Sequence, residues 1–122
     1  MIVYRELSSL ARDLGFEAKT LYAVSNSPEK HYRQVCLPKK DGGVRTLSVP
    51  DPLLKAIQRR ITQVLLVHMP VSSYATAYRY GGSTCRNAAP HVRQPVVLKL
   101  DIQHFFDSIL YSSVKERVFP PN

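Results

Sequence analysis

Residues 96–109 read VVLKLDIQHFFDSI, and this stretch decides the fold class of the chain. Its first five residues are mostly aliphatic and alternate at the period-two spacing of a β-strand, with Val96, Leu98 and Leu100 on one face. The run ends directly on Asp101, so we predict a strand that places a carboxylate at the rim of a sheet, where ligands and metal ions reach it. The alternative is that Asp101 only caps the turn after the strand, a common role for aspartate.

The overall charge of the chain is strongly positive. Its 122 residues carry a formal net charge of +8, with 17 Lys and Arg residues spread along the chain. The length suits one small domain or a piece of a larger one. A hydrophobic content of 44% is typical of a globular protein and excludes wholesale disorder. The charge indicates a nucleic acid as the first candidate partner and an anionic membrane surface as the second, and a basic protein with neither partner is the alternative.

The cysteines and the apolar runs favour a cytoplasmic protein without a membrane segment. Cys36 and Cys85 lack the Cys-x-x-Cys spacing of zinc sites, so we predict neither a zinc site nor a disulfide framework, which fits a reducing cytoplasm. The N-terminus lacks the long apolar core of a signal peptide, and no stretch approaches the length that spans a bilayer.

The first thirty residues are expected to form a small helical pair. Apolar residues at helical spacing predict a helix over 3–14 that stops at Gly15. A second helix is expected over 18–24, with Leu21 and Tyr22 facing inward.

A β-hairpin is predicted next, with strands over 32–37 and 44–49. The intervening PKKDGG contains an Asp-Gly pair, a strong hairpin signal because glycine tolerates the positive φ of a tight turn. The tip presents Lys39 and Lys40, and Arg45 follows it. These cations suit a polyphosphate, to which arginine offers a bidentate fork and lysine a point charge. The alternative is a solvated turn whose lysines only blunt an edge strand.

The clearest helix begins after Asp51, a good N-cap, with Pro52 at its first position, and its run ends at Pro70. The predicted buried stripe is Leu54, Ile57, Ile61, Val64 and Leu65. Three cations lie off that stripe, namely Lys55, Arg59 and Arg60. They either extend the positive surface or belong to an ordinary solvent-exposed face of the helix.

The segment from Tyr74 to Tyr80 is aromatic and is expected to be irregular or extended. Its tyrosines, beside Arg79, either stack on bases or pack in a core, and we expect at least one of them in a core. A helix capped by Ser83 is predicted to run to about His91. A last helix is predicted to begin at Ser113, which has capping-box spacing to a glutamate three residues later.

Four groups of residues, in this order, resemble the first half of a bacterial reverse transcriptase of the retron and group II intron type. They cover most of the chain, from about residue 31 to about residue 118. The groups are Tyr32 with PKKDGGVR at 38–45 and Pro50; LKAIQ at 54–58; AYRYGGS at 77–83 with Asn87, Ala88 and His91; and LDIQHFFDSI at 100–109.

The resemblance implies an α/β (α+β) fold, namely the fingers and a partial palm of a right-hand polymerase that stops before the second catalytic palm motif and the thumb. It implies an N-terminal helical segment at 1–30, a fingers subdomain at 31–95 and the start of an antiparallel palm at 96–122. The implied activity is RNA-directed DNA polymerisation, and the parent is a retron, intron or phage-defence enzyme.

For the palm, the resemblance implies a metal site and a nucleotide gate. Asp101 matches the first catalytic aspartate, which binds both Mg²⁺ ions, and the backbone carbonyl of Ile102 would be a further ligand. Phe106 matches the steric gate that lies under the sugar of the incoming nucleotide and excludes a 2′-hydroxyl. A carboxylate is the type of ligand that magnesium prefers.

For the fingers, the resemblance implies contacts to nucleotide and nucleic acid. Lys39 and Arg45 match the residues that hold the triphosphate of a dNTP, and Arg79 with the turn at 81–83 matches a motif near the nucleotide and template. The implied partners are an RNA template, a DNA or RNA primer and the missing palm and thumb. The cations assigned to nucleic-acid binding on the basic surface are Lys40, Lys55, Arg59 and Arg60.

The sequence departs from the family pattern mildly at three positions and seriously at one motif. Ala77 stands where glycine is frequent, Gly82 where a basic residue is frequent and His104 where an acid is common. No Asp-Asp pair occurs in the 122 residues, so the Tyr-x-Asp-Asp motif of the second metal site is missing. We therefore expect an N-terminal fragment that is inactive alone.

Three functions remain open from the sequence. The first is part of an enzyme that works only with its missing half. The second is a catalytically dead nucleic-acid-binding remnant, and the third is a protein-interaction remnant that uses the exposed palm edge strand. In each case we expect marginal stability or self-association, because the strand at 96–100 lacks its partner strands.

Overall fold

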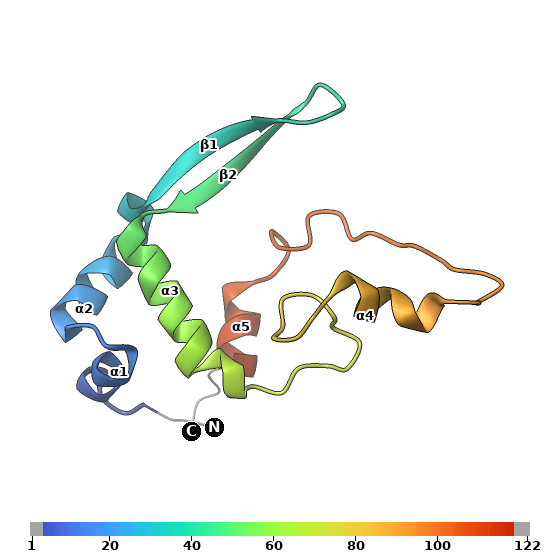
Figure 1. Ribbon diagram of the computed structural model, residues 1–122. Helices are drawn as coiled ribbons and strands as arrows, with labels where there is room; N and C mark the ends of the chain where they lie inside the picture. The colour runs from blue at the N-terminus through green and yellow to red at the C-terminus, as the bar shows by residue number, and fades with distance from the viewer. Residues whose placement is uncertain (1–3, 119–122) are drawn as a thin grey trace. The chain divides into compact units, whose positions relative to one another are not determined.

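The computed structural model describes residues 4–118 (Figure 1). The chain divides between Ser72 and Ser73 into two compact units. The described residues form a small α+β protein with a two-stranded antiparallel sheet, which confirms the coarse fold class. The three-part division at 1–30, 31–95 and 96–122 remains a prediction. The elements of the first unit are α1 (Leu7–Leu14), α2 (Ala18–Asn26), η1 (Pro28–His31), β1 (Tyr32–Pro38), β2 (Val44–Pro50), α3 (Pro52–Val64) and η2 (Leu66–His68). Those of the second unit are α4 (Thr84–Ala88), η3 (Ala89–His91) and α5 (Tyr111–Val118).

The two N-terminal helices form largely as predicted. Gly15 ends α1 in the left-handed conformation, with φ of 75°, and its N–H donates to the carbonyl of Arg12 at 3.1 Å. Of the predicted helix over 3–14, residue 3 lies outside the described residues. In α2, Leu21 is buried as expected, but the prediction for Tyr22 was wrong, since this side chain is 63% exposed.

The hairpin is confirmed in both its strands and its turn. β1 and β2 pair antiparallel from Tyr32 opposite Pro50 to Pro38 opposite Val44. Gly42 has a φ of 84°, and the N–H of Lys39 donates to the carbonyl of Gly43 at 2.7 Å to close the turn. The hairpin projects from the three helices of the first unit (Figure 1).

Helix α3 begins at the predicted N-cap. The carboxylate of Asp51 accepts a hydrogen bond from the N–H of Leu54 at 2.8 Å, which satisfies one of the donors that a helix start leaves free. The helix ends at Val64 and η2 follows it, so the helical run stops before Pro70.

The core of the first unit lies between α1, α2 and α3. Leu14 is its most buried side chain, at 2% exposed. From the predicted stripe of α3, two residues are buried, and Ile61 and Val64 pack partly against the cluster. The buried residues are Ala11, Leu14, Leu21, Val24, Leu54 and Ile57.

The second unit consists of short helices joined by irregular chain. Ser83 caps α4 as predicted, because its Oγ accepts from the N–H of Arg86 at 3.1 Å. The last helix, α5, begins at Tyr111, so Ser113 lies inside it and the prediction of Ser113 as the first cap was wrong. Within residues 4–118, no helix has the length and hydrophobicity to cross a membrane.

The predicted strand at 96–100 is not present in the described chain. These residues belong to no helix or ladder, and the sheet of residues 4–118 contains β1 and β2 alone. Val96 and Leu100 are 82% and 81% exposed. The physical reason is that a strand exists only with a hydrogen-bonded partner, because its backbone groups otherwise pair with water. The start of an antiparallel palm sheet was therefore a wrong prediction for these residues.

Candidate nucleotide and nucleic-acid site

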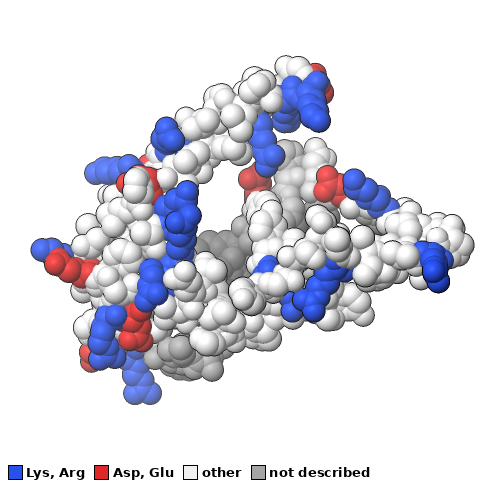
Figure 2. Space-filling model, in the orientation of Figure 1, with Lys and Arg blue, Asp and Glu red and all other residues white. Residues whose placement is uncertain are grey.

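The tip of the hairpin forms an exposed cluster of cations. Lys39, Lys40 and Arg45 are all exposed, and Arg45 lies opposite Leu37 in the ladder. The one acid of the turn, Asp41, accepts from the N–H of Gly43 at 3.1 Å. Within residues 4–118, none of the three cations forms an ion pair. Figure 2 shows Lys and Arg gathered at this end of the hairpin, which leaves their charge available to a phosphate.

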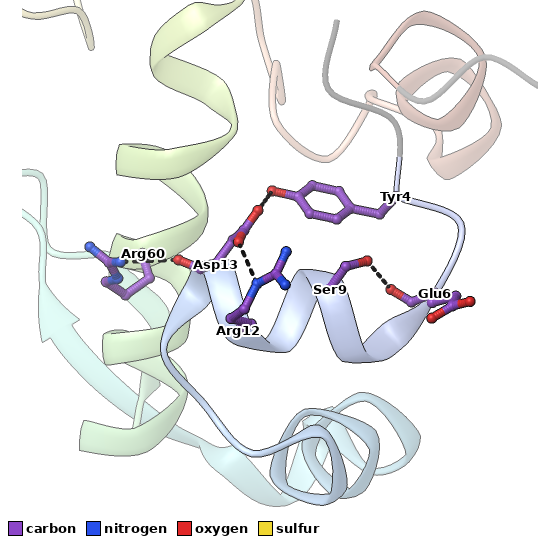
Figure 3. Close-up of polar contacts among 6 residues, drawn as sticks. All are labelled: Tyr4, Glu6, Ser9, Arg12, Asp13 and Arg60. Carbon is purple, nitrogen blue, oxygen red and sulfur yellow. Dashed lines mark hydrogen bonds and ion pairs between the residues drawn. The ribbon is translucent and has the colours of Figure 1, made fainter.

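The cations predicted on α3 fall into two kinds. Lys55 and Arg59 are exposed and lie one turn apart on the helix. The guanidinium of Arg60 instead donates to the main-chain carbonyl of Leu14 at 3.1 Å. It also donates to the main-chain carbonyl of Asp13 at 3.1 Å (Figure 3). These carbonyls belong to the C-terminal turn of α1 and have no partner within the helix, so Arg60 caps α1. A nucleic-acid contact of Arg60 remains a prediction.

Asp101 precedes a compact turn in the second unit. Its carboxylate is exposed, and residues 103–108 form successive turns. The N–H of Ser108 donates to the carbonyl of His104 at 3.0 Å, and His104 itself has a φ of 53°. His104 Nδ1 lies 3.3 Å from Oδ2 of Asp107, so the histidine at the family's acidic position engages the second aspartate of this segment.

The predicted gate residue contacts a second motif. The ring of Phe106 meets Tyr78 edge-on, with centroids 6.3 Å apart and planes at 81°. Phe105 also lies edge-on to Phe106, with ring centroids 5.2 Å apart. The contact between Tyr78 and Phe106 joins the segment at 77–83 to the segment at 100–109. The sequence does not predict it, because no spacing rule links aromatic residues so far apart in the chain.

The expectation of a tyrosine in the core was wrong. The three tyrosine side chains of this segment are almost fully exposed, at 95% for Tyr74, 96% for Tyr78 and 100% for Tyr80. The segment is irregular, as predicted. Irregular chain of this kind buries few side chains, so the rings remain on the surface.

The glycine turn explains one departure from the family pattern. The N–H of Gly82 donates to the carbonyl of Arg79 at 3.1 Å, and Arg79 Nη1 donates to the carbonyl of Ala75 at 3.4 Å. A Cβ at Gly82 would lie 2.5 Å from the carbonyl oxygen of Thr76. Because this neighbour is backbone, a basic residue does not fit at Gly82 without a change of the turn.

Metal ligands are sparse in the described chain. Within residues 4–118, no group of three or more His, Cys, Asp or Glu side chains is close enough to hold a metal ion. Magnesium binds through one or two carboxylates together with water and phosphate oxygens. Asp101 fits as one such ligand, but the described residues do not by themselves make a two-metal centre. Lys39 and Arg45 belong to the first unit, and Asp101, Phe106 and Arg79 to the second.

Residues 37–117, more than half of the chain, match the family described as reverse transcriptase (RNA-dependent DNA polymerase). The chain therefore belongs to the reverse transcriptase family. The relatives that it resembles are retron reverse transcriptases of bacteria.

The retron Mx65 reverse transcriptase of Myxococcus xanthus is 39% identical over 117 residues, which cover 93% of this chain and 27% of that protein. The retron Mx162 reverse transcriptase of the same organism is 38% identical over 85 residues, 70% of this chain and 18% of that protein. The retron Ec83 reverse transcriptase of Escherichia coli is 37% identical over 86 residues, 70% of this chain and 28% of that protein. The matched part of the chain thus covers between 18% and 28% of the length of these three relatives. No solved structure matches it.

Proposed function

We propose that this chain supplies the fingers and the first part of the palm of a retron RNA-directed DNA polymerase with the right-hand fold. The observation that carries the proposal is the family match over residues 37–117, which contains every residue assigned to the nucleotide site. Residues 1–30 would be a helical lead, 31–95 the fingers and 96–122 the start of the palm. The enzyme would act in the cytoplasm, where Cys36 and Cys85, both exposed and outside any disulfide, stay reduced.

The fingers residues would bind the incoming dNTP. Lys39 and Arg45 would hold its triphosphate, since both are exposed at the hairpin tip and outside the ion pairs of the described chain. Arg79 would lie near the nucleotide and the RNA template. Phosphoryl transfer depends on positioning and charge neutralisation more than on covalent help from protein, so such cations are what the reaction needs.

The palm residues would hold Mg²⁺ and select the sugar. Asp101 and the backbone carbonyl of Ile102 would be ligands of the two ions. When bound, two Mg²⁺ ions activate the 3′-hydroxyl of the primer and stabilise the departing pyrophosphate. Phe106 would exclude a 2′-hydroxyl, supported at its ring edge by Tyr78.

We propose further that the 122-residue chain does not polymerise alone. Asp101 is the single aspartate in a matching context, and a Tyr-x-Asp-Asp motif does not occur in the sequence. The apolar side chains at 96–100 are exposed, among them Leu98 at 78%, and they would pair with the rest of the palm in the complete enzyme. The alternative is a nucleic-acid-binding remnant without chemistry, which the exposed cations of the hairpin and α3 favour.

A primer-extension assay tests this proposal. The chain alone should extend no primer, whereas a chimera that joins it to the remaining length of the retron Mx65 enzyme should extend a DNA primer on an RNA template. Asp101→Ala in the chimera should abolish the extension. Extension by the chain alone would overturn the predicted inactivity, and an inactive chimera that still binds RNA would favour the remnant.

A further inference from the structure

A groove lies at the base of the hairpin, at the opposite end from the tip. This open groove has a volume of about 610 Å³ and lies between the start of β1, the end of β2 and the first two turns of α3. Four cations line it, from three elements of the first unit. They are Lys30 on η1, Arg33 on β1, and Lys55 and Arg59 on α3.

The charge of these four side chains is not neutralised within the described part of the chain, where none of them forms an ion pair. The one carboxylate in the lining, that of Asp51, contacts groups other than these four cations. It accepts from the N–H of Leu54 at 2.8 Å and lies 2.7 Å from His31 Nδ1. Four like charges around one groove repel one another, so the arrangement favours an anionic occupant.

The groove is separate from the tip cluster. β1 runs from Tyr32 at the groove to Pro38 at the turn, a span of about 20 Å at about 3.3 Å per residue. One triphosphate does not bridge that distance, so the two cation clusters serve different anions or different parts of one polymer.

We infer that the groove is a binding site for the phosphodiester backbone of an RNA strand, independent of the tip that would hold the dNTP. This inference rests on the proposed function. A concave site suits a strand, whereas a bilayer surface is met by protruding side chains. Tyr32 lines the groove, and the amide of Gln58 donates to its Oη at 2.8 Å, which fixes the ring for stacking on a base.

The test is RNA binding by the 122-residue chain, followed by the fluorescence anisotropy of a labelled single-stranded RNA of about 20 nucleotides, longer than the site of one small binding domain. The groove variant is Lys55→Gln/Arg59→Gln. The matched control is Arg12→Gln/Lys19→Gln, which removes the same charge from two exposed cations outside the groove. A third protein, Lys39→Gln/Arg45→Gln, removes the same charge from the two exposed tip residues that would hold the dNTP. Far-UV circular dichroism checks that each variant folds.

The groove variant should bind about tenfold more weakly, and its plot of log affinity against log salt should flatten by about 1.4, since each phosphate contact to a single strand contributes about 0.7. The control and the tip variant should change much less. Equal losses in all three variants would overturn the groove but leave the proposed function intact. Loss of RNA binding in the tip variant alone would also overturn the groove as the RNA site. Binding to phosphatidylserine vesicles that depends on the groove and that RNA does not displace would overturn it too.

Discussion

The guanidinium of Arg60 donates a hydrogen bond at 3.1 Å to the carbonyl of Leu14, a residue that lies 46 positions earlier in the chain. A second bond of 3.1 Å reaches the carbonyl of Asp13, so one side chain on α3 completes the end of α1 (Figure 3). We predict that Arg60→Ala lowers the free energy of unfolding by about 1.5–3 kcal/mol, the range for hydrogen bonds that involve a charged group. Urea denaturation measures this change.

The neighbouring cation provides the control for that prediction. Arg59→Ala removes the same charge and the same type of side chain, but Arg59 lines the groove and, among the described residues, donates no hydrogen bond to α1. Its effect on unfolding should be within about 0.5 kcal/mol, as at other surface positions. If Arg60→Ala left stability unchanged and instead weakened RNA binding, its main role would be the nucleic-acid contact predicted from sequence.

The glycine turn gives a prediction that opposes the family pattern. Gly82→Arg introduces the type of residue that is frequent in relatives, but its Cβ would lie 2.5 Å from the backbone oxygen of Thr76. We expect the turn to open at a cost of about 1–3 kcal/mol, typical of overpacking. Hydrogen exchange of amides in the second unit should accelerate. Gly43→Ala is the control, since its Cβ would meet only the side chains of Asp41 and Lys39, at 3.3 and 3.5 Å.

The N-cap of α3 should make stability depend on pH. The hydrogen bond from the N–H of Leu54, and then the one to His31, hold the pKa of Asp51 below its ordinary value. A carboxyl group with a depressed pKa stabilises the fold above its unfolded-state pKa, about 3.9, and loses that contribution as pH falls through the folded value. Asp51→Asn, which keeps a capping side chain, should therefore melt at a lower temperature than the parent at pH 7.

The same comparison at low pH checks the sign. As pH falls through the lowered pKa of Asp51 the carboxyl group becomes protonated, and the two melting temperatures should converge. Circular dichroism melts between neutral and acid pH make the measurement. A gap that stays constant over the whole range would mean that charge at Asp51 contributes nothing and only the shape of the cap matters.

Local chemistry made the first unit predictable from sequence. The Asp-Gly pair in the turn, Gly15 after α1 and Asp51 with Pro52 before α3 each fix a backbone conformation within a few residues. The structure therefore has these boundaries close to where the sequence predicts them. The groove was not predicted, because its cations come from η1, β1 and α3 and converge only after the hairpin pairs with itself.

Residues 96–100 show where prediction from sequence failed. Their alternation describes which side chains a strand would bury, but a ladder also needs a second strand, and the described chain offers none to Val96 or Leu98. The alternation of apolar residues can be read from the segment itself, whereas strand pairing depends on a second segment elsewhere in the chain. The same limit applies to Asp101, whose predicted place at a sheet rim depended on that strand.

The exposed aliphatic segment leads to a prediction about association. Leu98 and Leu100 are 78% and 81% exposed within a run of apolar residues. We expect the isolated chain to self-associate as its concentration rises, and Leu98→Lys to reduce this, because a charge in such a run opposes strand pairing between chains. Sedimentation velocity measures the self-association. Val67→Lys is the control, since Val67 is also exposed, at 58%, but lies in η2. An equal effect of both substitutions would point to net charge as the cause.

The contact between Tyr78 and Phe106 predicts how the sugar of the nucleotide is selected. In the active chimera, Phe106→Ala should raise the incorporation of ribonucleotides relative to deoxyribonucleotides, because the ring that would meet the 2′-hydroxyl is removed. Tyr78→Ala should shift the ratio in the same direction but less, since an edge-on pair contributes only about 0.5–1.5 kcal/mol to holding the ring. The measurement is single-nucleotide extension with matched dNTP and rNTP. Tyr80→Ala is the control, because that side chain is 100% exposed and makes no ring contact among the described residues. If Tyr80→Ala shifted the ratio as much as Tyr78→Ala, the edge contact would have no role in selection and the aromatic segment would act only through the template.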